Sequence, residues 1–192
     1  EKVPSEEFVT VEALGHLWIR DLASGQPRRL TSQNDHFELY PAWSRDGRSI
    51  VYTTWNDTDL GSIRVIPASG GSGRVITGNP GHYIEPTFSP DGRTVVYRTV
   101  GDGNLTTALW TRNPGIYRIA TAGGEPTLIT DEGVSPSFGA SNDRVFYVGR
   151  EDDKRALKSS DLNGHEERTH LLSEFAAEFA VSPDERWVAW TE

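Results

Sequence analysis

The stretch Pro86-Thr-Phe-Ser-Pro-Asp-Gly-Arg-Thr-Val-Val-Tyr-Arg-Thr99 decides the fold, because the chain contains it more than once. A nearly identical stretch begins 45 residues earlier at Pro41, and a looser copy begins 50 residues later at Pro136. The last apolar position of each copy recurs at steps of 45, 50 and 43 residues, on Tyr52, Tyr97, Tyr147 and Trp190. A period of about 40–45 residues with several short strands in each unit is typical of a β-propeller.

A second marker repeats with the same spacing. Residues 17–31, 63–77 and 116–130 align without a gap, and each segment holds a short apolar strand, a turn of small residues and a closing strand. Glycines at these turns supply the positive φ that a tight hairpin needs. Each repeat is therefore predicted to contain four strands, which we call A to D in chain order. In the second repeat we expect them at residues 41–44, 49–55, 63–68 and 74–77.

These repeats predict an all-β fold, a β-propeller of four-stranded antiparallel blades with about four repeats in this chain. We expect a single propeller segment over residues 1–192, with repeats near 4–44, 45–89, 90–139 and 140–182 and a fifth begun at 183–192. One arrangement would close a four-bladed ring by pairing strands at 179–191 with strands at 17–31. We favour an arc of a larger ring, whose end faces would be larger apolar patches than a soluble monomer usually exposes.

Composition narrows the classes of function. The chain has 192 residues, a net charge of −9 and neither cysteine nor methionine, and its missing initiator methionine leads us to expect a processed or excised piece. Without cysteine, thiol catalysis and cysteine-based metal sites are excluded. An acidic surface argues against nucleic-acid binding, and no apolar run approaches the length of a membrane span. We therefore expect neither nucleic-acid binding nor membrane insertion.

The motif Ser-Pro-Asp-Gly-Arg, placed between an aromatic strand and an apolar strand that ends in Tyr, resembles the repeat of TolB-type propellers. Residues 89–93 match it fully, residues 44–48 and 182–186 each differ at one position, and residues 141–143 have lost it. The longer segment 101–119 is most similar to the propellers that precede metal-dependent amidohydrolase domains. That resemblance implies a non-catalytic propeller portion of an exported, periplasmic bacterial hydrolase, with the metal ligands in a separate domain.

The same resemblance leaves two other functions open. One is a stand-alone TolB-type periplasmic module that binds a peptide or protein at the channel mouth. The other is a propeller that filters substrates for a serine peptidase of the prolyl-oligopeptidase type. The expected partner is a catalytic domain of the same polypeptide or a protein or peptide, and exposed blade faces would also allow self-association. No cofactor is expected in this chain.

Candidate binding residues follow from the strand order. Because strands alternate in direction, the A–B and C–D turns share one face, and these turns are short and similar. The B–C and D–A connections share the other face, where longer and more variable loops lie. Function concentrates on variable loops held by a rigid scaffold. We predict that this face makes the contacts, although solvated loop residues would give the same pattern; the candidates are His36, Glu38, His82, Tyr83, Glu85, Trp110 and Arg112.

Catalytic motifs are scarce. His36 and His82 hold similar positions in successive repeats, each ahead of an aromatic residue and an acid, and such a set would suit zinc if the loops brought it together. Repeats copy residues for structural reasons, so we predict no metal site. Asp57 and Asp59 lack the glycine and terminal glutamate of a calcium loop. Neither a Gly-x-Ser-x-Gly elbow nor a His-Glu-x-x-His motif occurs.

Overall fold

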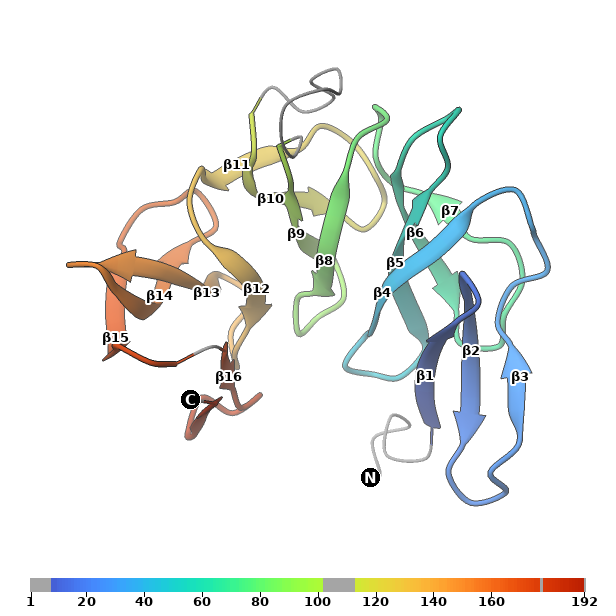
Figure 1. Ribbon diagram of the computed structural model, residues 1–192, viewed down its shortest axis with the longest axis horizontal. Coiled ribbons are helices and arrows are strands. Elements are labelled where there is room, and N and C mark those ends of the chain that lie inside the picture. The colour runs from blue at the N-terminus through green and yellow to red at the C-terminus, as the bar shows by residue number, and fades with distance from the viewer. Residues whose placement is uncertain (1–7, 102–112, 177, 192) are drawn as a thin grey trace.

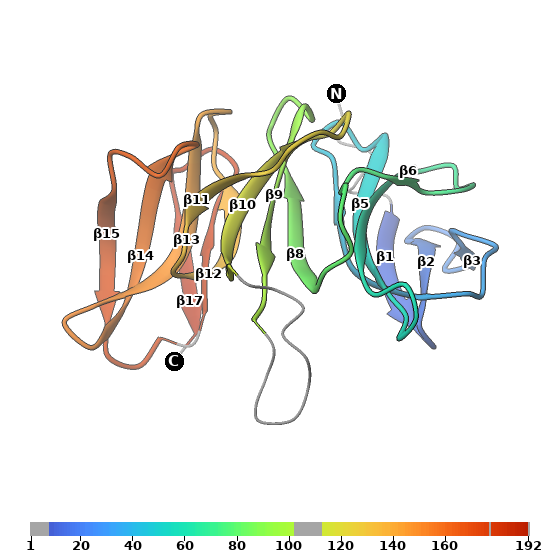
Figure 2. The ribbon, with the colours of Figure 1, turned by 90° about the horizontal axis from the view of Figure 1, so that it is seen from above.

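The computed structural model describes residues 8–101, 113–176 and 178–191. All regular elements in this part of the chain are strands, and every pairing between them is antiparallel. They form five separate sheets that follow one another around an arc (Figure 1). Seen from above, the sheets stand next to each other like the blades of a propeller (Figure 2). The predicted all-β propeller fold is confirmed.

The five sheets, which we call blades 1 to 5, follow chain order. Blade 1 holds β1 (Phe8–Ala13), β2 (His16–Asp21) and β3 (Pro27–Arg29); blade 2 holds β4 (Phe37–Trp43), β5 (Ser49–Trp55), β6 (Ser62–Pro67) and β7 (Arg74–Val75); blade 3 holds β8 (Tyr83–Phe88), β9 (Thr94–Thr99), β10 (Gly115–Ala120) and β11 (Thr127–Thr130); blade 4 holds β12 (Val134–Phe138), β13 (Arg144–Glu151), β14 (Lys154–Asp161) and β15 (Arg168–Ser173); blade 5 holds β16 (Glu178–Val181) and β17 (Val188–Thr191).

The four predicted strands of the second repeat form one sheet in the order β4-β5-β6-β7. The inner strand, β4, begins four residues before the predicted segment. Blade 4 is as regular as the others, although its sequence repeat is degenerate: β14 and β15 pair over residues 155–173. Strands form where apolar positions and turns are suitably placed, and the repeated motif itself is not required. The blade therefore forms although the motif is degenerate.

The core lies between the blades. Strand β5 is covered on both sides, because Ile50 and Tyr52 pack against blade 1 while Val51 packs against blade 3. Equivalent clusters join blades 2 and 3 and blades 3 and 4. Each buried aliphatic side chain of this kind stabilises the fold by about 1.5–3 kcal/mol. The unbroken apolar run of the B strands therefore reflects burial on two faces.

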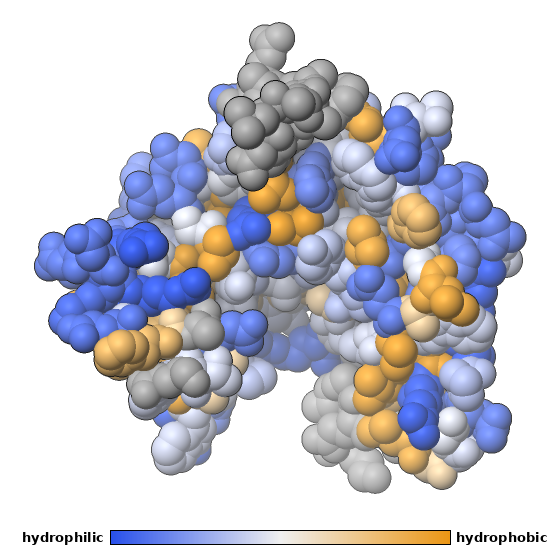
Figure 3. All heavy atoms as spheres, in the orientation of Figure 1, coloured by the Kyte–Doolittle hydropathy of each residue, from blue (hydrophilic) through white to orange (hydrophobic). Residues whose placement is uncertain are grey.

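The arc is open. Strand β2 lies between β1 and β3, and the described strands of blade 5 pair only with each other. The alternative four-bladed ring, in which blade 5 would have paired with the strands of blade 1, is therefore wrong. Figure 1 shows the two ends of the arc apart, and Figure 3 shows apolar side chains gathered over β1. Val9 and Val11 of that strand are 42% and 40% exposed.

The recurring Ser-x-Asp turn is held by the same hydrogen bonds in several blades. In blade 3, Ser89 Oγ donates to Asp91 Oδ1 over 2.6 Å, and the Arg93 amide donates to the same oxygen over 3.0 Å. Gly92 follows with a φ of 70°, a conformation that favours glycine. The motif that carries the family resemblance therefore fixes a turn. Within the described residues no helix is present that could span a membrane.

Candidate functional site

The face that carries the A–B turns is tied together by hydrogen bonds between blades. Arg45 Nη2 donates to the Gly139 carbonyl over 2.7 Å, although the two residues are 94 positions apart. The Asp91 amide donates to Asn142 Oδ1 over 2.9 Å, and the Ala140 amide donates to Glu185 Oε1 over 2.7 Å. Since these bonds join blades 2, 3 and 5 to blade 4, this face holds the inner strands at fixed positions.

The opposite face, with the B–C and D–A connections, is more variable than the sequence suggested. In blades 1 and 4 the B–C connection is a two-residue turn, Leu14-Gly15 and Asp152-Asp153, with positive φ at all four residues. Positive φ at both central residues is the geometry of a tight hairpin turn. In blade 2 the same connection spans residues 56–61. The B–C connections of blades 1 and 4 are therefore tight turns, whereas that of blade 2 is a longer loop.

The first two candidate residues lie at the junction of blades 1 and 2. Glu38 is completely buried: its Oε2 accepts hydrogen bonds from the Leu17 amide at 2.9 Å and from Thr31 Oγ1 at 2.8 Å, and its Oε1 accepts one from Gln33 Nε2. A carboxyl group with these partners joins the two blades and offers nothing to a docking partner. His36 is also buried, with Nδ1 3.0 Å from Asp35 Oδ1.

The electrostatics of His36 follow from that burial. Its Nε2 is buried with no hydrogen-bond partner among the described residues. Burial, with a smaller contribution from the Arg64 charge, holds the pKa of His36 below its usual range. The imidazole is therefore neutral at pH 7, where it lies close to a permanent cation.

The next three candidates belong to blade 3 and have different surroundings. His82 is exposed, and its ring lies 5.2 Å from the Trp55 ring. Tyr83 is half-buried; its hydroxyl donates to the Asn79 carbonyl over 2.8 Å, and burial raises its pKa. Glu85 Oε2 accepts the Ser135 amide over 2.8 Å and lies 3.7 Å from Arg98 Nε. Glu85 thus joins blade 3 to blade 4 near the axis.

The remaining candidates, Trp110 and Arg112, lie outside the described residues. The two histidines have separate partners, Asp35 for His36 and the Trp55 ring for His82. Within the described ranges, no group of three or more acidic or histidine side chains is placed to hold a metal ion.

A cavity of about 390 Å³ lies along the channel between the inner strands of blades 2 to 5. Each inner strand of blades 2, 3 and 4 has a bulge where the residue before a proline adopts positive φ: 52° at Tyr40, 54° at Glu85 and 54° at Ser135. A left-handed non-glycine residue costs on the order of 1–3 kcal/mol, and such strain persists only where surrounding contacts enforce it. The Glu12 and Glu85 carboxylates provide such contacts by accepting the Tyr40 and Ser135 amides.

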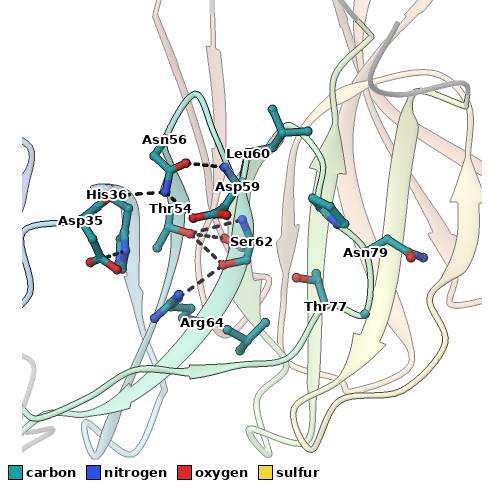
Figure 4. A pocket seen from close by; sticks show the side chains of 14 residues that line it. Asp35, His36, Thr54, Asn56, Asp59, Leu60, Ser62, Arg64, Thr77 and Asn79 are labelled. Carbon is teal, nitrogen blue, oxygen red and sulfur yellow. Dashed lines mark hydrogen bonds and ion pairs between the residues drawn. The ribbon is translucent and has the colours of Figure 1, made fainter.

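A second cavity, of about 250 Å³, opens beside the B–C loop of blade 2 (Figure 4). Its lining combines His36 with Thr54, Asp59, Ser62 and Arg64. Sequence reasoning missed both Arg64 and the channel residue Tyr40. The signal for Arg64 was available, because the aligned position is Trp18 in the first repeat and Tyr117 in the third. A charge in place of an aromatic residue marks the position where blade 2 departs from its neighbours.

Comparison with known proteins agrees with this architecture. A family model described as the TolB beta propeller domain matches residues 8–192. The chain belongs to the TolB beta propeller domain family. No curated protein matches this sequence.

Several solved propellers resemble this TolB-type chain. They include an oligogalacturonate lyase from Vibrio parahaemolyticus (12% identity, TM-score 0.75, covering 96% of this chain and 55% of that one), an oligogalacturonate lyase in complex with manganese (15%, 0.73, 95% and 55%) and the tricorn protease (12%, 0.69, 97% and 23%). Identities this low show the fold alone. The chain spans about half the length of the two lyases, so the arc matches part of a larger propeller.

Proposed function

We propose that this TolB-type propeller is the non-catalytic portion of an exported, periplasmic bacterial hydrolase of the amidohydrolase type. In this role it acts as scaffold, gate or interaction surface for a catalytic domain outside the chain. The observation that supports the proposal is the contrast between its two faces. Hydrogen bonds from blade to blade tie one face together, whereas the other face carries the variable loops and a cavity.

The fixed face gives the loop face a rigid base. Arg45, Asn142 and Glu185 bind the A–B turns of other blades, so this face keeps the inner strands in fixed positions. Loops on such a base present their side chains with little loss of conformational entropy on binding. A domain that docks there would cover the channel mouth, and this geometry would let the propeller control access to a catalytic site.

Docking is tested with the double variant Trp110→Ala/Arg112→Ala in the full polypeptide. We expect weaker association of the propeller with the catalytic domain, seen as faster separation of the two by limited proteolysis, while the unfolding midpoint of the propeller stays the same. Arg48→Ala is the matched control, because Arg48 lies in an A–B turn on the opposite face and its side chain is 85% exposed. Unchanged docking in the double variant would contradict the proposal.

Catalysis is tested on the chain itself. The purified 192-residue chain should hydrolyse neither amide nor ester substrates, and measurable hydrolysis by it would contradict a non-catalytic role. The gene sequence beyond residue 192 distinguishes the candidates. A His-x-His motif with later His and Asp ligands supports the amidohydrolase, whereas a Gly-x-Ser-x-Gly elbow supports the peptidase filter. Export is tested by fractionating cells that express the full gene, and cytosolic recovery would count against it.

A second candidate function is a stand-alone interaction module that binds a peptide or protein at the channel mouth. The cavity of about 390 Å³ favours it, because strained residues such as Tyr40 line that space and 44% of Tyr40 is exposed. Strained residues of this kind are concentrated at binding sites. Further repeats followed by a stop codon after residue 192 would support this candidate over the first.

A further inference from the structure

The cavity beside blade 2 contains an arginine without a carboxylate partner. Arg64 projects from β6 and is half-buried, and its Nε donates to Ser62 Oγ over 3.3 Å (Figure 4). Within the described residues, no Asp or Glu oxygen lies within 4.0 Å of its guanidinium, although the chain has 28 acidic residues against 19 basic ones. Charges that lose their contact with water are normally paired. An unpaired guanidinium in a cavity is therefore suited to an anionic group from outside.

Blade 4 shows how the same fold neutralises a cation at this position. Lys158 lies opposite Tyr147 in the sheet, as Arg64 lies opposite Tyr52. In blade 4, Glu167 accepts hydrogen bonds from Lys158 Nζ at 2.9 Å and from the Tyr147 hydroxyl at 2.6 Å.

Blade 2 has no carboxylate at the position that Glu167 occupies in blade 4. In blade 4, Lys158 pairs with Thr169, and Glu167 lies two residues before Thr169. In blade 2, Arg64 pairs with Val75, and the residue two positions before Val75 is Gly73. Gly73 therefore holds the position of Glu167. Gly73 is also required by packing, because a Cβ there would lie 2.0 Å from the Tyr52 hydroxyl oxygen. The carboxylate that completes blade 4 is thus absent from blade 2, and Arg64 lines the cavity instead.

An unpaired negative charge lines the same cavity. Asp59 is exposed, and its Oδ2 accepts a hydrogen bond from Asn56 Nδ2 over 3.2 Å. No Lys, Arg or His nitrogen of the described chain lies within 4.0 Å of it, Arg64 included. Asp35 also lines the cavity and lies 3.0 Å from His36 Nδ1, but that imidazole is neutral at pH 7. The cavity therefore contains one cation, Arg64, and two carboxylates, Asp35 and Asp59, neither of which pairs with it.

We propose that this cavity binds a small zwitterion, a free α-amino acid, with its carboxylate on Arg64 and its ammonium group facing Asp59. An arginine can bind a carboxylate through two parallel hydrogen bonds. The Thr77 hydroxyl accepts the Ile63 amide over 3.2 Å, so its own hydrogen is available to the ligand. A volume of about 250 Å³ is below the range of drug-sized pockets, which limits the ligand to a small molecule. The proposal does not depend on the function proposed above.

The proposal is tested by titrating the chain with L-alanine while recording amide chemical shifts by NMR. We expect saturable shifts confined to the segments that line the cavity, residues 35–36, 54–64 and 75–80, with a Kd on the order of 1 mM. Acetate and methylamine, each of which carries one of the two charges, should bind at least about tenfold more weakly. Absence of saturable shifts up to about 50 mM L-alanine, or equal binding of acetate and L-alanine, would overturn the proposal.

Variants locate the site. Arg64→Gln should weaken L-alanine binding at least about tenfold, and Asp59→Asn should reduce the preference for L-alanine over acetate. Lys158→Gln is the matched control, since it removes the equivalent cation of blade 4 and should leave binding unchanged. Arg64→Lys keeps the charge but cannot form two parallel hydrogen bonds. Its affinity for L-alanine should therefore lie between that of the natural chain and that of Arg64→Gln. Unchanged binding in folded Arg64→Gln would overturn the proposal.

Discussion

The junction between blades 1 and 2 and the junction between blades 4 and 5 arise from the same repeat, yet they are packed differently. At the first junction Leu17, Ile50 and Ile66 are all 0% exposed. In blade 5, Trp187 is 71% exposed, and Trp190, which aligns with the buried Tyr52 of blade 2, is 50% exposed. Strand pairing does not explain the difference, because β16 and β17 are paired in register at all four positions. Burial between blades therefore distinguishes the two junctions.

The cause lies in the number of strands that each junction brings together. Blade 2 contributes four strands and blade 1 contributes three, so side chains such as Ile50 have neighbours on every side. Blade 5 contributes only β16 and β17 among the described residues. A propeller blade is a small sheet that cannot bury its apolar faces alone, so its stability depends on its neighbours. We expect substitutions at the two junctions to differ accordingly.

The largest difference is expected from removal of apolar side chains. Ile50→Ala should lower the free energy of unfolding by about 2–5 kcal/mol, because it creates a cavity in a fully buried cluster. Trp187→Ala, although it removes a larger side chain, should change it by less than about 0.5 kcal/mol, since that side chain is mostly in water. Urea unfolding followed by circular dichroism measures both. Equal losses for the two variants would contradict the comparison.

A smaller difference is expected from two glutamates that each accept an amide from a neighbouring blade. Glu38→Ala should lower the free energy of unfolding by about 1–3 kcal/mol, because it leaves the buried Leu17 amide without its acceptor. Glu185→Ala removes a similar bond to the Ala140 amide, but at an exposed residue, where water replaces the lost oxygen.

Urea unfolding of both glutamate variants tests this difference, with the loss for Glu185→Ala expected to be less than half of that for Glu38→Ala. Glu38→Gln, which keeps one acceptor oxygen, should fall between Glu38→Ala and the natural chain. A loss for Glu185→Ala as large as that for Glu38→Ala would show that burial at the first junction is not the cause.

The fold could be predicted from the sequence because the repeat recurs with a fixed period, and each copy contains the turn residues that its hairpins need. Blade 4 shows how little of the motif is required, since residues 141–143 have lost most of it and the blade still forms. The open arc was also predicted, in preference to a closed four-bladed ring.

The candidate site was predictable only in part. Glu38 and Glu85 each follow a histidine and an aromatic residue, yet Glu38 is fully buried, whereas Glu85 holds the bulge position of Tyr40 and is half-buried beside Arg98. The amides that these carboxylates accept, from Leu17 and Ser135, belong to neighbouring blades, and a repeat alignment does not contain such contacts. Arg45 illustrates the same limit, because its bond to Gly139 spans 94 residues. Contacts between non-adjacent blades follow from the curvature of the arc and not from the spacing of a motif.

The smallest effect is expected at the Ser-x-Asp turns, which both junctions share. The Ser44 hydroxyl and the Arg48 amide hold the pKa of Asp46 below its usual value, and the Ser182 hydroxyl and the Arg186 amide do the same for Asp184. Because the folded-state pKa is lowered, each carboxylate stabilises the fold above about pH 4 and loses that contribution as the pH falls toward its folded-state pKa.

Asp46→Asn and Asp184→Asn should each make the stability of the chain less dependent on pH between about pH 5 and pH 3, because asparagine does not titrate in this range. Urea midpoints measured at several pH values give the slope. If the turn acts through its own hydrogen bonds, the two variants should reduce the slope equally despite the difference in burial between the junctions. If the slope falls only in Asp46→Asn, the contribution of this turn to stability depends on a packed neighbouring blade. Burial between blades would then control the turns as well as the apolar core.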